Sequence, residues 1–230
     1  MVMTASQSSL FSRRAAGWAL ASAALLAAWP AARAGGLDSL AQFVQSARSG
    51  TAEFTQTVTA PAKAGQAARS KSQSGSFEFH RPGKFRFDYR TPFAQTIVAD
   101  GRTLWLYDAD LNQVTARQQD QVLGATPAAI IAAAPDLKAL ERDFTLSEEP
   151  DSHGQQWVKA IPKARDGQLQ SIRVGFTSKA QGGPQLTTLE IADSFGQRSV
   201  LSFSKIELNA AVPASRFQFK PPAGADVLRN

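Results

Sequence analysis

The stretch FEFHRPGKFRFDY, residues 77–89, predicts a β-hairpin, because two runs in which aromatic and polar residues alternate flank a short turn. Side chains two positions apart point to the same face of a strand, so each run has one aromatic face. These faces are formed by Phe77 and Phe79 in the first run and by Phe85, Phe87 and Tyr89 in the second. Arg81 stands at the turn, directly before Pro82. These residues alone leave two interpretations open, an ordinary hairpin with an apolar inner face or a binding site with an arginine at its rim.

The same alternation continues along most of the chain after residue 50, which predicts roughly ten short strands in one curved antiparallel sheet or barrel. The run over residues 51–60 places Phe54 and Val58 on one face. Asp100 precedes a glycine at the centre of residues 94–108, which is typical of a tight hairpin. The further runs are residues 111–117, 144–149, 156–163, 169–179, 185–196, 197–209 and 216–222. A membrane-spanning barrel is the competing interpretation, but many outward positions are threonine, glutamine or charged residues.

Two regions show the helical period instead. Residues 37–50 carry apolar side chains at helical spacing, which predicts one amphipathic helix before the sheet. Thr126 followed by Pro127 is a typical helix start, and the apolar residues after it predict a helix that ends before Pro135. A second short helix is predicted over residues 136–142. Helices before and within the strand region are suited to cover an open side of the sheet.

The first 34 residues are typical of a secretion signal, so we expect cleavage after Ala34. Arg13 and Arg14 provide a positive start, and residues 15–29 form an apolar run that is short for a membrane span. Residues 32–34 match the small-x-small cleavage pattern. Ordinary secretion is favoured over the twin-arginine route because alanines follow the arginine pair, and an uncleaved anchor is the alternative.

Residues 35–230 are expected to form a single domain, because no repeat, linker or low-complexity tract divides them. They carry 22 basic and 19 acidic side chains, since the leader holds three arginines and no acidic residue, and this near balance argues against nucleic-acid binding. Arg69 and Lys71 lie in an expected polar loop, residues 61–75, where an acidic partner or membrane headgroups are a hypothesis for them. The chain has no cysteine, so Gly35 stands where a bacterial lipoprotein would carry its acylated cysteine.

The sequence contains none of the common catalytic or metal-binding motifs, such as HExxH, GxSxG or a phosphate-binding glycine loop. Residues 108–112, DADLN, begin like a calcium-binding loop. However, Gln113 and Gln119 stand where such a loop needs a glycine and a final acidic residue, so a hairpin turn is predicted. We therefore expect no enzymatic activity, no metal and no cofactor.

Four blocks of sequence together resemble a known family: HRPGKFRFDY (80–89), VADGRTLWLYDADLNQVTAR (98–117), TPAAIIA (126–132) and RFQFKPPAGADV (216–227). In this order they resemble the periplasmic outer-membrane lipoprotein carriers of the LolA family, over essentially the whole mature chain. The resemblance implies a mainly β fold, an incomplete (half-open) antiparallel β-barrel of about ten to eleven strands. Short helices would cover its open side as an α lid and enclose a hydrophobic cavity. Phe87 stands where many members have tryptophan.

The resemblance also implies roles for individual residues. Arg81 matches an arginine that hydrogen-bonds lid backbone from the barrel rim, which implies a reversible latch for the lid. Phe85 matches a position near the cavity mouth and is implied to contact ligand or partner. The other cavity or core candidates are Phe54, Phe79, Phe87, Leu104, Trp105 and Leu106, and alternation places Trp105 on the face opposite its two leucine neighbours. The expected lid contacts are Val122, Leu123, Ile130 and Ile131.

The family's task, as the resemblance implies it, is that of a periplasmic chaperone for acylated lipoproteins. Such a carrier accepts lipoproteins from an ATP-driven release complex in the inner membrane, shields their acyl chains and delivers them to an outer-membrane receptor. Because that receptor is itself a lipoprotein, Gly35 favours the carrier. A monomer in the periplasm is expected, with no nucleic-acid partner. A periplasmic lipid- or lipoprotein-sensing module of the same fold is the alternative.

Overall fold

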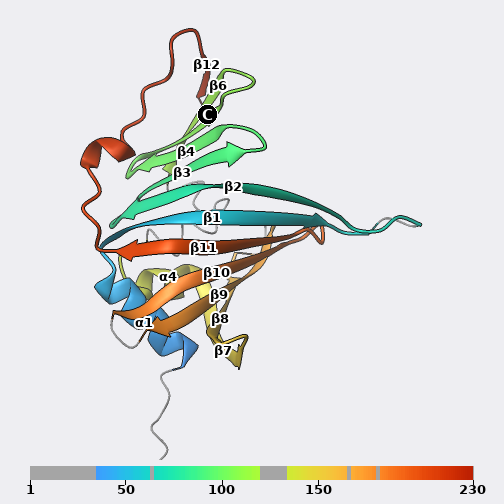
Figure 1. The fold of residues 1–230 in the computed structure, drawn as a ribbon, viewed down its shortest axis with the longest axis vertical. Coiled ribbons are helices and arrows are strands. Elements are labelled where there is room, and N and C mark those ends of the chain that lie inside the picture. The colour runs from blue at the N-terminus through green and yellow to red at the C-terminus, as the bar shows by residue number, and fades with distance from the viewer. Residues whose placement is uncertain (1–34, 63–64, 120–133, 165–166, 180–181, 230) are drawn as a thin grey trace, which may run out of the picture. The chain divides into compact units, whose positions relative to one another are not determined.

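The computed structural model describes residues 35–62, 65–119, 134–164, 167–179 and 182–229, and most of them form β-strands (Figure 1). The strands are β1 (Ser49–Ala60), β2 (Arg69–His80), β3 (Lys84–Thr91), β4 (Gln95–Asp100), β5 (Thr103–Asp108), β6 (Gln113–Gln118), β7 (Phe144–Ser152), β8 (Gln155–Pro162), β9 (Leu169–Lys179), β10 (Gly183–Asp193), β11 (Arg198–Leu208) and β12 (Asp226–Arg229). The helices in the described part are α1 (Gly36–Ser46), α4 (Leu137–Asp143) and the short 3-10 helix η2 (Ala214–Phe217).

All the strands belong to one sheet with the order β12-β6-β5-β4-β3-β2-β1-β11-β10-β9-β8-β7. The sheet is open, because the described residues place β12 and β7 at its two edges. Neighbouring strands are antiparallel except β12, which runs parallel to β6. This arrangement confirms the predicted class, a half-open antiparallel sheet with short helices, with slightly more strands than expected.

The β2–β3 hairpin forms as the alternation predicts, because its aromatic residues pair across the two strands. Phe77 lies opposite Phe87, and Phe79 lies opposite Phe85. All four side chains are buried on one face of the sheet, which we call the inner face. The core on this face continues across the sheet to Val174 on β9 and the strands beside it. Aromatic cross-strand pairs stabilise a sheet register, so the hairpin and the core support each other.

Helix α1 covers part of the inner face with its apolar stripe. Leu40, Phe43 and Val44 are buried, and the helix contacts β7, β8, β9 and β10. The helix starts close to the sheet, since a Cβ added at Gly36 would lie 2.3 Å from the Trp157 carbonyl oxygen. Only glycine permits this approach, so this residue helps set where the helix meets β8.

The C-terminal segment covers the opposite, outer face of β3 to β5. Helix η2 contacts β3 and β4, and Phe217 at its end is 2% exposed. The ring centroid of Phe219 lies 5.6 Å from that of Trp105 on β5. Residues 216–222 were predicted as a strand, and this prediction is wrong, because Arg216 and Phe217 end η2 and residues 218–222 form no strand. The final strand is β12 instead, and it extends the sheet at the edge beside β6 (Figure 1).

The predicted polar loop over residues 61–75 is shorter than expected, because β2 begins at Arg69. Arg69 and Lys71 therefore lie on a strand that pairs with β1, and both are exposed. The predicted helix over residues 136–142 is confirmed as α4, with the Asp136 side chain accepting a hydrogen bond from the Ala139 main chain at 2.8 Å. The expected leader and the helix that starts at Thr126 lie outside the described residues.

Candidate functional site

Arg81 lies at the β2–β3 turn, where its guanidinium bonds main-chain atoms of two other segments. Its Nε donates to the carbonyl oxygen of Ala47, the residue after α1, at 2.7 Å. Its Nη1 donates to the carbonyl oxygen of Ala134, which lies shortly before α4. The main-chain N–H of Arg81 donates to the carbonyl oxygen of Arg48 at 2.8 Å, which holds the turn itself in place. The side chain thus connects the rim of the sheet to both helical regions.

The surroundings of Arg81 are apolar although the residue carries a charge. It is 5% exposed, and its guanidinium carbon lies 5.3 Å from the ring centroid of Phe43 and 5.5 Å from that of Phe79. Burial lowers the pKa of Arg81 to about 10, and the nearby charge of Arg48 contributes in the same direction. Arg81 therefore remains charged at neutral pH, held by carbonyl oxygens and by the faces of two aromatic rings.

The aromatic residues of the inner face pack into one cluster beside Arg81. The ring centroids of Phe54 and Phe87 are 5.4 Å apart, and those of Phe85 and Phe87 are 6.1 Å apart. Phe79 lies 6.3 Å from Phe43 of α1 and so joins the sheet to the helix. The structure therefore brings together the four phenylalanines that were predicted to line a cavity or form the core.

The three candidates on β5 divide between the two faces. Leu104 packs against the inner core, and Leu106, two residues on, is half-buried on the same face. Trp105 lies on the outer face, where it packs against Phe219 and its Nε1 donates to Asp100 Oδ2 at 3.2 Å. Trp105 is therefore not part of the inner cluster. The predicted lid contacts Val122, Leu123, Ile130 and Ile131 lie outside the described residues.

A small apolar pocket opens on the inner face close to the Arg81 side chain. It has a volume of about 20 Å³, enough for about one water molecule. Its lining residues are Phe43, Thr51, Ala52, Phe77, Phe79, Leu186, Phe203, Ile206 and Leu208. Most of them were not among the predicted cavity residues. Phe43 lies in residues 37–50, for which helical spacing predicted an apolar stripe, and Phe77 belongs to the predicted hairpin of residues 77–89. Nothing in the local pattern indicated that Leu186 and Phe203 would meet them, because β10 and β11 are distant in the chain.

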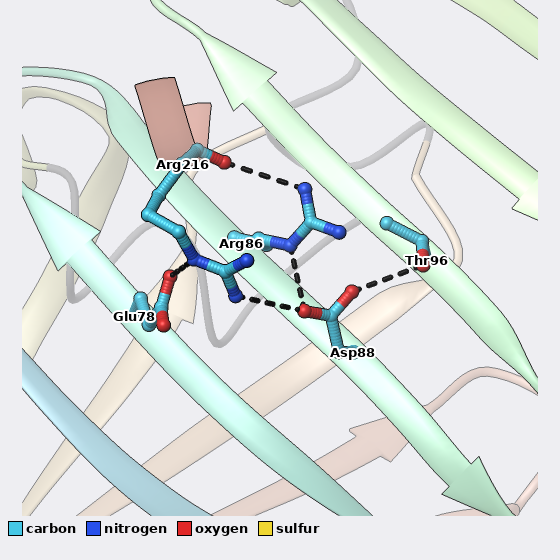
Figure 2. Close-up of polar contacts among 5 residues, drawn as sticks. All are labelled: Glu78, Arg86, Asp88, Thr96 and Arg216. Carbon is cyan, nitrogen blue, oxygen red and sulfur yellow. Dashed lines mark hydrogen bonds and ion pairs between the residues drawn. The ribbon is translucent and has the colours of Figure 1, made fainter. Parts of the chain in front are cut away.

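A network of charged residues on the outer face holds η2 to β2, β3 and β4 (Figure 2). Arg216 donates from Nε to Glu78 Oε2 at 2.8 Å and from Nη2 to Asp88 Oδ2 at 3.1 Å. Arg86 donates from Nε to the same Asp88 oxygen at 2.6 Å and from Nη1 to the Arg216 carbonyl oxygen at 3.3 Å. Thr96 Oγ1 donates to Asp88 Oδ1 at 3.0 Å. Asp88 is thus the centre of this network.

The charge state of Asp88 follows from these contacts. Burial by itself raises the pKa of the Asp88 carboxyl group. The hydrogen bonds from Arg86 and Thr96, together with the positive charges of Arg86 and Arg216, more than offset this and hold the pKa below its usual value. Asp88 is therefore ionised at neutral pH and pairs with both arginines.

The segment that begins like a calcium-binding loop, residues 108–112, is a turn. Asp108 Oδ1 accepts hydrogen bonds from the main-chain N–H groups of Asp110 and Leu111, both at 3.1 Å, so residues 108–112 form the predicted hairpin turn. Among the described residues, no group of three or more histidine, cysteine or acidic side chains is placed to hold a metal ion. None of the helices in those residues is long and apolar enough to span a membrane.

These features define a class of protein: an open antiparallel sheet with an aromatic inner face, covered by a helix and closed at one rim by a buried arginine. A family model described as outer membrane lipoprotein carrier protein LolA matches residues 45–220. The chain is 66% identical over 199 residues to the outer-membrane lipoprotein carrier protein of Albidiferax ferrireducens, covering 86% of this chain and 93% of the relative. It is 53% identical over 220 residues to the protein of that name from Leptothrix cholodnii, covering 95% and 98%.

The solved structure of a LolA superfamily protein from Nitrosomonas europaea aligns with a TM-score of 0.46 at 15% identity, covering 78% of this chain and 94% of that one. The family-model match and the identity to these two relatives are sufficient to assign the family without the structural alignment. The chain belongs to the LolA family of outer-membrane lipoprotein carrier proteins.

Proposed function

We propose that this protein is a periplasmic chaperone that accepts lipoproteins released from the inner membrane, shields their acyl chains and delivers them to an outer-membrane receptor. One observation carries the proposal: in a chain of this family, a buried arginine at the sheet rim bonds the main chain of Ala47 and Ala134 beside an aromatic inner face. A relative that is 66% identical to this chain over 199 residues is named outer-membrane lipoprotein carrier protein.

The energetics of the cargo explain why a carrier is needed. Each CH₂ group that moves from water into an apolar site gains about 0.8 kcal/mol. Several long acyl chains therefore oppose free diffusion by a free energy on the order of tens of kcal/mol. A carrier must cover most of this surface, yet it must also release the chains, so tight and permanent burial would defeat its purpose.

The inner face would have to open before it could accept an acyl chain. The apolar pocket there holds only about 20 Å³, far less than a long acyl chain occupies. We propose that the bonds from Arg81 to Ala47 and Ala134 form the latch of this closed state and break when cargo enters. When the cargo leaves, the latch bonds form again, and their free energy partly offsets the cost of exposing the acyl chains.

Opening would expose the phenylalanines that now fill the interior. Phe54, Phe79, Phe85 and Phe87 are 4% exposed or less, so they contact cargo only in the open state. We propose Phe85 as a contact for cargo or partner, together with Leu104 and Leu106 on the same face of β5, the strand beyond β4. Val122, Leu123, Ile130 and Ile131 complete the proposal as lid residues. Trp105 is left out because it lies on the outer face.

The cellular setting of the proposal is the periplasm. A leader cleaved after Ala34 would export the chain, and the mature domain would span residues 35–230. Its partners would be acylated lipoproteins, an ATP-driven release complex in the inner membrane and a lipoprotein receptor in the outer membrane. A monomer that forms a one-to-one complex with its cargo is sufficient for this cycle, which requires no covalent chemistry.

The experiment that tests the function uses purified residues 35–230 and spheroplasts that make an acylated lipoprotein. We expect the lipoprotein in the supernatant as a one-to-one complex with the protein. A second step adds the receptor and measures the transfer of cargo. Failure to release lipoprotein in the first step would overturn the proposed function.

The latch has its own test within the same assay. Arg81→Leu removes the bonds that favour the closed state, so we expect loading to persist and transfer to the receptor to slow. Arg142→Leu is the matched control, because Arg142 is exposed on α4 and pairs only with its neighbour Asp143 among the described residues. Equal loading and transfer in the Arg81→Leu variant and the unmodified protein would overturn the latch.

A further inference from the structure

A second pocket lies at the end of the sheet opposite the Arg81 turn. It has a volume of about 370 Å³ and is lined by Gln73, Tyr89, Phe93, Gln95, Asp108, Asp110 and Leu111. Its walls come from the β3–β4 connection, residues 92–94, the β5–β6 turn, residues 109–112, and the adjoining ends of the strands. Antiparallel strands place both connections at the same end of the sheet, and β2 and β3 continue from there to the Arg81 turn (Figure 1).

This pocket begins where the aromatic core ends, and Tyr89 forms the boundary. The Tyr89 ring centroid lies 5.0 Å from that of Phe54 and 6.2 Å from that of Phe87, so one side of the ring belongs to the core. Its hydroxyl donates to Gln56 Oε1 at 2.9 Å. Burial raises the pKa of Tyr89 to about 12, so this hydroxyl stays protonated at neutral pH. The inner face therefore changes from apolar to polar at this residue.

The polar groups beyond Tyr89 include two free amides. Gln73 and Gln95 are half-buried, and throughout the described ranges neither side-chain amide has a hydrogen-bond partner. Asp108 Oδ1 already accepts hydrogen bonds from two main-chain N–H groups of its own turn. The opening is apolar, because Phe93 is 65% exposed and Leu111 is 70% exposed. Both side chains line the same pocket, so together they give its opening an apolar edge.

A ligand that fits this arrangement is apolar at one end and carries carbonyl groups at the other. The acylated amino terminus of a lipoprotein has this form, since ester and amide carbonyls join its acyl chains to the modified cysteine. These carbonyls lose hydrogen bonds to water when the chains enter a protein, and each unpaired group costs free energy. The amide N–H groups of Gln73 and Gln95 lie at the boundary between the apolar core and the polar pocket, where they can donate hydrogen bonds to these carbonyls in place of water.

We propose that this pocket binds the ester and amide carbonyls of the acylated cysteine through Gln73 and Gln95, while the acyl chains occupy the inner face beyond Tyr89. The proposal rests on the proposed function and adds a polar subsite to it. Phe93 and Leu111 cover the junction from the outside. The carrier would then recognise the junction between acyl chain and polypeptide as well as the acyl chain itself.

The test compares two ligands on purified residues 35–230. One is a fluorescent synthetic lipopeptide with a tripalmitoylated cysteine, and the other is N-phenyl-1-naphthylamine, an apolar dye without carbonyl groups. The double variant Gln73→Leu/Gln95→Leu should bind the lipopeptide about tenfold more weakly, as expected for the loss of two hydrogen bonds, and bind the dye unchanged. Gln185→Leu is the control, because Gln185 is a half-buried strand residue that alternation places away from the inner face.

The possible outcomes separate the two proposals. Unchanged lipopeptide affinity in the double variant, or equal weakening for both ligands, would overturn the polar subsite and leave the carrier function intact. Absence of lipopeptide binding by the unmodified protein would overturn both. Gln73→Glu provides a second variant that exchanges the amide donor for an acceptor without changing the size of the side chain, and it should weaken lipopeptide binding in the same direction.

Discussion

The Nε of Arg81 donates to the carbonyl oxygen of Ala47 at 2.7 Å, which connects the β2–β3 turn to the residue directly after α1. Ala134 accepts a second bond from the same guanidinium. Because Arg81 is buried, removing its side chain would take one hydrogen-bond donor from each of these carbonyls. The position therefore affects stability as well as the proposed latch, and the two effects can be measured separately.

Replacing Arg81 by leucine should lower the free energy of unfolding by about 2 kcal/mol, because a buried carbonyl without a hydrogen bond costs about 1–3 kcal/mol. Removal of a buried charge offsets part of that loss. Urea unfolding followed by tryptophan fluorescence measures the change. Arg48→Gln is the control. Arg48 is exposed and its charge disfavours the protonated form of Arg81, so this substitution should not lower the free energy of unfolding. An Arg81→Leu protein as stable as the unmodified one would contradict the prediction.

Asp88 should make stability depend on pH in the acidic range. Its pKa in the folded protein is below the usual value, so its ionised form stabilises the fold above about pH 4, where it is also ionised in the unfolded chain. This contribution is lost as pH falls through the folded pKa. The stability difference between the unmodified protein and Asp88→Asn should be largest at pH 7 and decrease below about pH 4. Urea unfolding at several pH values measures it.

Asp151→Asn is a suitable comparison for this titration, because Asp151 is exposed and has no ion pair among the described residues. The difference in the free energy of unfolding between Asp151→Asn and the unmodified protein should stay small at every pH. A difference for Asp88→Asn that is constant between pH 7 and pH 3 would show that the carboxylate charge is not what stabilises the network.

The C-terminal segment should loosen when Arg216 is replaced by glutamine. The substitution removes the ion pairs to Glu78 and Asp88 that hold η2 against the sheet. Because Arg216 is partly exposed, we expect a local loss of about 1 kcal/mol, which corresponds to about fivefold faster chymotrypsin cleavage after Phe219. Mass spectrometry of timed digests measures the rate. Arg198→Gln removes a more exposed pair with Glu190 and should leave this cleavage unchanged.

Gly75→Ala should destabilise the β2–β3 hairpin. A Cβ at this position would lie 2.0 Å from the Asp88 carbonyl oxygen, so β2 and β3 must move apart. Overpacking of this kind typically costs about 1–3 kcal/mol. Thermal unfolding measures the loss. Gly167→Ala is the control, because an added Cβ there meets no atom closer than 4.0 Å. Similar melting temperatures for the two variants would contradict the prediction.

Local patterns predicted most of the described elements. Alternating aromatic residues predicted the β2–β3 hairpin, the Asp100-Gly101 pair predicted the β4–β5 turn, and helical spacing predicted α1. They failed for residues 216–222, where alternation suggested a strand, because Arg216 and Phe217 end η2 and the residues after them form no strand before β12. The aromatic residues of this segment pack against the outer face of the sheet instead of pairing with a neighbouring strand, and alternation cannot distinguish these two arrangements.

The candidate site was only partly predictable for the same reason. The resemblance identified Arg81, but its partners Ala47 and Ala134 lie 34 and 53 residues away and accept through main-chain atoms, which leave no mark in the sequence. The pocket bounded by Gln73 and Gln95 was not predicted at all, because isolated glutamines on strands carry no local signal.

By itself, the sequence determined the period of each segment, the places where it turns and the family to which it belongs, because these depend on neighbouring residues. Only the tertiary structure decided which face of β5 is the inner one, and so put Leu104 in the core and Trp105 outside it. It also decided what covers each face, α1 on the inner side and the segment from η2 onward on the outer side. The physical reason is that a strand's two faces are equivalent until distant segments pack against them.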